Sequence, residues 1–151
     1  MAPVVCEVSI ARPPAEVFAY VTDPSRFGEW QASVVSAHIE EDGPQRPGSR
    51  CVMTRRIGGS QRTTVSEVTD VSPPRTWAIH GIDGPIRADV NVTVDPAGGG
   101  QGSHVTIRLD FHGHGFGTVL LPVVVWQARK EAPQSAQSLK QRLEAGEHRE
   151  H

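Results

Sequence analysis

Cysteine is scarce in this chain of 151 residues, where Cys6 and Cys51 are the two present. Neither belongs to a Cys-x-x-Cys pair, so the sequence carries no zinc-ribbon or dithiol redox motif. Both lie in short apolar segments, and we interpret them as buried, unpaired thiols. The sequence shows no cofactor-binding motif either, so we predict no cofactor.

Long apolar runs are also absent. The longest run covers residues 119–126 and is interrupted by Pro122, whereas a membrane span needs about 20 apolar residues. The N-terminus has no basic segment followed by an apolar stretch, so we expect no signal peptide. From these features we predict a cytoplasmic protein without a membrane span.

Charge of one sign does not dominate. The formal net charge is −2 and the sequence pI is about 6.4, which is too little to attract nucleic acid or an anionic membrane through overall charge. With 37% hydrophobic and 21% charged residues, the composition is that of an ordinary globular protein. We predict a single domain over residues 1–145 and a polar tail over residues 146–151, in a monomer or homodimer whose partner is a small molecule rather than nucleic acid.

What the sequence does contain is a series of alternating apolar and polar segments. This pattern predicts strands at residues 4–10, 34–41, 50–57, 61–71, 76–82, 86–94 and 103–112. Short links rich in glycine and proline join most of them, which is typical of an antiparallel sheet. Because one face of each strand is apolar, we expect the rest of the chain to cover that face.

Helical patterns supply the cover. We predict a short helix over residues 15–21 and a second from Asp23-Pro24 to about Trp30. A long helix is predicted over residues 116–144, with a kink or brief break at Pro133 and with a covering face formed by Val119, Leu120, Val123, Val124, Gln127, Leu139 and Leu143. The fold is then α+β, a curved seven-stranded antiparallel sheet around a long C-terminal helix. A helix about 10–12 Å across cannot fill such a sheet, so a cavity is expected.

Several short motifs occur in the same order as in one known family: Ala-Arg-Pro-Pro-Ala-Glu-Val-Phe at 11–18, Asp23-Pro24 to Trp30, Gly48, Glu67-Val68 before Pro73-Pro74-Arg75, and the helix end around Leu139 and Leu143. They resemble the polyketide cyclase/dehydrase-like (SRPBCC) branch of the START/Bet v 1 superfamily. The resemblance implies a helix-grip fold with a hydrophobic ligand in its cavity.

The resemblance leaves more than one function open. The chain could bind a small hydrophobic or aromatic ligand of lipid- or polyketide-like character. Alternatively, it could be a polyketide cyclase/dehydrase-type enzyme that uses acid–base residues in the cavity. A third alternative is a partner-binding protein of the same fold, which an unusually large exposed apolar patch would favour.

Two charged residues share predicted inner faces. Arg55 alternates in register with Cys51, Met53 and Ile57, and Glu67 with Val65 and Val71. As candidates for catalysis, Arg55 would anchor an enolate or carboxylate and Glu67 would act as a base. The alternative is a β-bulge that shifts the register and turns both side chains to water.

Aromatic and aliphatic side chains are predicted to form the rest of the pocket. Trp30, Trp77 and Trp126, the last on the predicted long helix, are candidate stacking surfaces for a planar ligand. The alternative is that these side chains only fill the core. The full set of predicted ligand-binding residues is Trp30, Met53, Arg55, Glu67, Trp77, Ile79, Val92, Ile107, Phe111, Leu120 and Val124.

Histidines and glycines are interpreted more simply. His80, His104 and His112 fall on the outer parity of their strands, so no metal site is predicted. Gly113, Gly115 and Gly117 surround the turn into the long helix, where they serve either as a hinge or as a helix-entry loop that needs positive φ.

Overall fold

The computed structural model describes residues 3–57 and 59–146. After the first strand, β1 (Val4–Ile10), come α1 (Pro14–Val21), the 3₁₀ turn η1 (Pro24–Arg26) and α2 (Phe27–Trp30). The chain continues through β2 (Val34–Ile39), β3 (Arg50–Ile57), β4 (Ser60–Ser72), β5 (Thr76–Gly81), β6 (Ile86–Ala97), η2 (Gly98–Gly100) and β7 (Gly102–Gly113). The last element is α3 (Gly117–Ala145).

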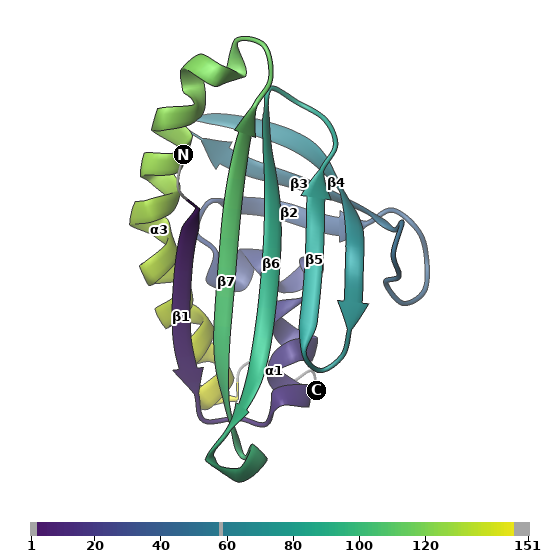
Figure 1. Cartoon of the computed structure of the whole chain (residues 1–151), viewed down its shortest axis with the longest axis vertical. Helices are drawn as coiled ribbons and strands as arrows, with labels where there is room; N and C mark the ends of the chain where they lie inside the picture. The colour runs from purple at the N-terminus through teal and green to yellow at the C-terminus, as the bar shows by residue number, and fades with distance from the viewer. Residues whose placement is uncertain (1–2, 58, 147–151) are drawn as a thin grey trace.

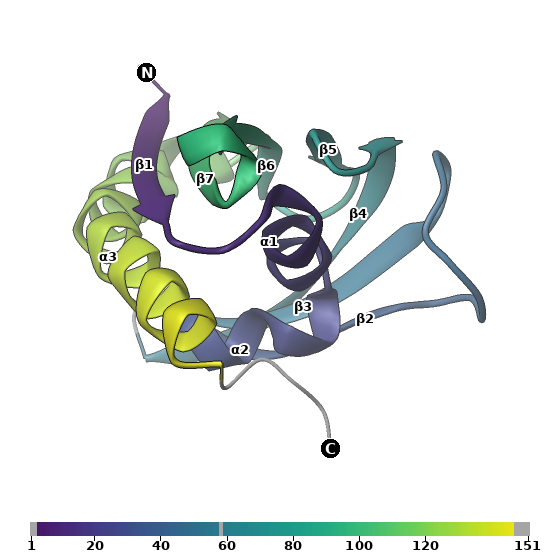
Figure 2. The same ribbon diagram turned by 90° about the horizontal axis from the view of Figure 1, so that it is seen from below.

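The strands form one seven-stranded antiparallel sheet in the order β1-β7-β6-β5-β4-β3-β2. In Figure 1, α3 runs along one edge of this sheet beside β1. Figure 2, seen from below, shows the sheet curling from β5, β6 and β7 on one side to β2 and β3 on the other, with α1, α2 and α3 closing the space between. The predicted helix-grip architecture is confirmed.

The core lies inside this curl. Alternation along β6 and β7 places Val94 and Val105 on the concave face, where both are fully buried. From the helices, Val17 of α1 and Leu139 and Leu143 of α3 meet them with no exposed surface. The apolar faces produced by a period of 2 along the strands and of 3.6 along the helices therefore meet in one interior.

Two irregularities change the predicted strand faces. In β2 the pairing with β3 shifts between Val34 and Ser36, so Val34 is buried while Val35 is 45% exposed. Strict alternation with Ala37 and Ile39 along the predicted strand 34–41 would bury Val35, and the shift in pairing is what exposes it. A bulge adds one residue, which reverses the faces on either side of it.

The second irregularity moves Glu67 away from the interior. The pairing of β4 with β5 shifts between Val68 and Asp70. Val68 pairs with the buried Ile79 and is itself fully buried, whereas Glu67 pairs with the exposed His80. Glu67 therefore lies on the outer face, and its predicted place in the cavity is wrong. The predicted inner face of Val65 with Val71 fails for the same reason.

The long helix also departs from the prediction. α3 is continuous across Pro122 and Pro133, so the brief break expected at Pro133 is not found. Val119 and Val123 were expected on its covering face but are 77% and 58% exposed. The helix ends at Ala145, and the next residue, Gly146, has a φ of 78°, the left-handed cap conformation that glycine adopts readily. The predicted tail beyond Gly146 lies outside the described residues.

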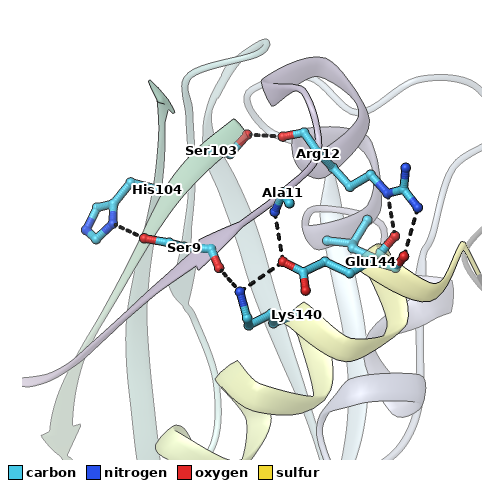
Figure 3. Close-up of polar contacts among 8 residues, drawn as sticks. Ser9, Ala11, Arg12, Ser103, His104, Lys140 and Glu144 are labelled. Carbon is cyan, nitrogen blue, oxygen red and sulfur yellow. Dashed lines mark hydrogen bonds and ion pairs between the residues drawn. The ribbon is translucent and has the colours of Figure 1, made fainter. Parts of the chain in front are cut away.

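The C-terminal end of α3 is tied to the segment after β1 (Figure 3). Arg12 donates to the carbonyl oxygens of Leu143 and Glu144, at 2.9 and 2.8 Å. The Glu144 carboxylate accepts from the Ala11 backbone N–H and from the Lys140 ammonium, both at 2.9 Å. A cation at the C-terminus of a helix satisfies its last carbonyls and complements the helix dipole.

Candidate functional site

A cavity of about 160 Å³ lies between the sheet and α3. Its wall is largely apolar because alternate residues of β3, β5, β6 and β7 point to the concave face. Of the predicted ligand-binding residues, the structure brings together Trp30, Met53, Arg55, Trp77, Ile79, Val92, Ile107, Phe111 and Val124 around this space. Such an apolar space with few polar groups is typical of small-molecule sites.

An outer compartment of about 340 Å³ shares Met53, Arg55, Phe111 and Val124 with the inner one. Leu120 lines this outer part and not the inner cavity. The outer part reaches the β3–β4 hairpin at Arg62 and the β5–β6 turn at Pro85. The site is therefore an inner chamber that continues toward the N-terminal half of α3.

Arg55 provides the cationic group of the inner wall. It is held from β3 because the alternation of Cys51, Met53 and Arg55 is unbroken there. One terminal nitrogen donates to Ser33 Oγ at 2.8 Å, and the other donates to Gln31 Oε1 at 3.0 Å. A third of the Arg55 side chain remains accessible. The guanidinium is therefore fixed in place with a surface still turned to the cavity.

Glu131 of α3 is the acidic partner that the sequence analysis missed. Its Oε2 lies 3.5 Å from Arg55 and accepts a 2.8 Å hydrogen bond from Ser33. Burial lowers the pKa of Arg55, and the Glu131 charge partly opposes that shift. The helical period could have located Glu131, since it follows Val124 by two turns and Gln127 by one.

Three aromatic rings line one part of the chamber. Phe27 meets Trp30 and Trp77 edge to face, with ring centroids 6.1 and 6.0 Å apart. The Trp77 indole donates to Gln45 Oε1 at 2.8 Å. The Trp30 indole N–H is buried and has no hydrogen-bond partner among the described residues. Trp126 is 61% exposed and does not line the chamber.

The residues expected outside the site lie outside it. His80 and His112 both contact the Asp89 carboxylate on the outer face, and His104 contacts Glu7 at 2.7 Å. Within residues 3–57 and 59–146, no cluster of histidine, cysteine and acidic side chains could hold a metal ion. Cys51 is a buried free thiol, as predicted, and burial raises its pKa to about 11, whereas the free thiol of Cys6 is only partly buried.

Gly113, Gly115 and Gly117 lie around the start of α3, which is closely packed. A Cβ on Gly117 would lie 2.0 Å from the Pro85 carbonyl oxygen, and one on Gly113 would lie 2.7 Å from Thr118. Of the three, only Gly115 has a positive φ, 61°. Tight backbone contact at two positions and a left-handed residue at the third therefore account for these glycines.

Sequence comparison adds the family. A family profile described as polyketide cyclase/dehydrase and lipid transport matches residues 1–144. The chain belongs to this family. A search of curated proteins gives no match. The described part of the chain has no helix of the length and apolar character that a membrane span requires.

Solved structures share the fold of this polyketide cyclase/dehydrase-like chain. A protein from Thermus thermophilus is 19% identical, with a TM-score of 0.77 and coverage of 96% of this chain and 99% of that one. The Zhui aromatase/cyclase from a Streptomyces species is 14% identical, with a TM-score of 0.73 and coverage of 96% and 97%. A START superfamily protein from Mycobacterium smegmatis is 16% identical, with a TM-score of 0.70 and 95% coverage of both chains.

Proposed function

We propose that the protein binds a small hydrophobic or aromatic molecule, of lipid- or polyketide-like character, with the polar end of the ligand at Arg55. The observation that carries this proposal is the pairing of an apolar chamber with one fixed ion pair, Arg55 and Glu131, on its wall. Family membership supports the same class of ligand.

The ion pair determines which end of the ligand lies at Arg55. An oxygen that accepts from Arg55 would replace hydration that the guanidinium has lost on burial. The rest of the ligand would then lie along Met53, Ile79 and Val92 toward the ring of Trp77. A ligand that is apolar at one end and carries a carbonyl, enolate or carboxylate at the other fits this wall.

A specific observation favours enzymatic action as a second candidate. The Glu131 carboxylate stands beside a cation on the cavity wall, which is the arrangement needed for abstraction of a proton next to a carbonyl. The proton would pass to Glu131, and Arg55 would stabilise the enolate until the proton returns or a leaving group departs. Glu131, and not Glu67, takes the role of base in this proposal.

Substitution of Glu131 and Arg55 separates the two candidates. If the protein is a carrier, Glu131→Gln should change its affinity for the co-purified ligand by no more than a few-fold, and no turnover should be seen. Arg55→Met should weaken that affinity about tenfold or more. An enzyme with Glu131→Gln would still bind its substrate but lose turnover by about a hundredfold or more.

Native mass spectrometry of the purified protein, followed by extraction and identification of any bound compound, supplies the ligand for these assays. Arg108→Met is the matched control because Arg108 pairs with Asp110 on the outer side of β7. Equal effects of Arg55→Met and Arg108→Met on binding would contradict the proposal.

A further inference from the structure

The N-terminal half of α3 exposes an apolar stripe. Phe116, Val119, Val123 and Trp126 are 68%, 77%, 58% and 61% exposed. Their spacing of three, four and three residues places them on one side of the helix. Figure 1 shows this half of α3 at the outer edge of the molecule. Large apolar side chains gathered this way on a surface indicate an interaction site.

Basic side chains lie next to the stripe at Trp126 and in the compartment that Val123 lines. Lys130 lies 4.5 Å above the Trp126 ring, and Arg129 is exposed beside it. Arg62 and Arg87 line the outer compartment together with Val123. The helix carries no acidic residue before Glu131, and Glu131 faces the inner cavity. This surface is therefore positive in a chain whose formal net charge is −2.

One acidic side chain, Asp83, also lines the outer compartment, where it accepts a hydrogen bond from the Val65 backbone N–H at 2.7 Å. Its single negative charge is outnumbered there by the positive charges of Arg62 and Arg87. The stripe, the basic side chains and the mouth of the cavity are continuous, because Val123 belongs to the stripe and also lines the outer compartment.

We propose that this surface docks on an anionic lipid bilayer, with the stripe in the headgroup region and the basic side chains on lipid phosphates. A helix with an aromatic and aliphatic face flanked by lysine and arginine is suited to the plane of such an interface. The proposal stands independently of the ligand in the cavity. The attraction to the bilayer would come from the basic side chains near the stripe and not from the net charge of the chain.

A second copy of the chain fits this surface less well. In a two-fold pairing through the stripe, the same patch meets itself. Lys130 and Arg129 of both copies would then be added to one interface, and α3 offers no acidic residue before Glu131 to pair with them. An anionic bilayer offers the opposite charge.

Vesicle flotation tests the proposal. The wild-type chain is mixed with vesicles of phosphatidylcholine alone or of phosphatidylcholine with phosphatidylglycerol in equal parts. We expect binding to the anionic vesicles, which added salt weakens. Trp126 reports insertion through a blue shift of its emission, because Trp30 and Trp77 are already buried at 6% and 2% exposure.

Two double variants and a matched control complete the experiment. Phe116→Ser with Val119→Ser should lower partitioning about tenfold or more, and Arg129→Gln with Lys130→Gln should do the same at low salt. The control is Val5→Ser with Val35→Ser, which changes valines that are 49% and 45% exposed on β1 and β2. Thermal unfolding of each variant confirms that it is folded.

Several results would overturn the proposal. They are no flotation of the wild type, equal flotation with neutral vesicles, or equal loss in the control. Sedimentation of the lipid-free protein as a dimer that the Phe116→Ser, Val119→Ser variant dissociates would assign the stripe to a second copy instead.

Discussion

The two ends of α3 are held in opposite ways. At the C-terminal end, Leu139 and Leu143 are fully buried, and Arg12 and Lys140 fix the last turn to the β1–α1 segment. At the N-terminal end, Val119 is 77% exposed and the neighbouring wall is the mouth of the outer compartment. The buried C-terminal end of α3 therefore holds the helix on the sheet, and ligand exchange is expected at the exposed N-terminal end.

The largest expected effect contrasts one buried and one exposed residue of α3. Leu139→Ala should lower the free energy of unfolding by about 2–5 kcal/mol, because it leaves a cavity in the core. Val119→Ala should change it by less than about 0.5 kcal/mol. Urea unfolding of both variants measures the difference, and similar losses would contradict the contrast between the two ends.

A smaller effect is expected at the cap. Arg12→Met removes the cation that binds the Leu143 and Glu144 carbonyls, and should cost about 1–2 kcal/mol in the free energy of unfolding. Arg75→Met is the control, since the Arg75–Asp95 pair is half exposed, and such pairs contribute less than about 1 kcal/mol. If Arg12→Met were no more harmful than Arg75→Met, the cap would not hold the helix end.

The smallest expected effect depends on pH. The hydrogen bond from Lys140, followed by that from the Ala11 backbone, lowers the pKa of Glu144 below its ordinary value of 4.5. The unfolded chain therefore binds this proton more readily, so the stabilisation is present above pH 4.5 and is lost as the pH falls through the lower folded pKa.

Acid titration of stability measures this term. In Glu144→Gln, the free energy of unfolding should fall less steeply below pH 4.5, by about 0.5 kcal/mol or less because the side chain is 32% exposed. Identical acid profiles for the wild type and Glu144→Gln would show that the carboxylate adds nothing at this end.

Unbroken alternation made much of the architecture predictable from the sequence. Arg55 was placed correctly on the inner face because β3 has no bulge between Cys51 and Arg55. Glu67 was misplaced because one additional residue near Val68 reverses the faces of β4. A bulge depends on how two strands pair, and the alternation within a single strand does not report it.

The helix shows a different limit. Its apolar residues between 119 and 126 are nearly continuous, so periodicity alone does not distinguish the covering side from the exposed stripe. The distinction comes from the sheet edge against which α3 packs. Glu131 lies on the covering side, but its partnership with Arg55 and Ser33 joins segments that are far apart in the sequence.

Calorimetric titration with 2-naphthoate and 2-naphthalenemethanol tests the central claim most directly. The two probes share a planar apolar ring system, but only the first carries a carboxylate that Arg55 could bind. The wild type should bind 2-naphthoate about tenfold or more tightly than the alcohol, and Arg55→Met should remove that preference while retaining the alcohol. Absence of binding for both probes, or a preference that survives in Arg55→Met, would contradict a cavity that orients its ligand through Arg55.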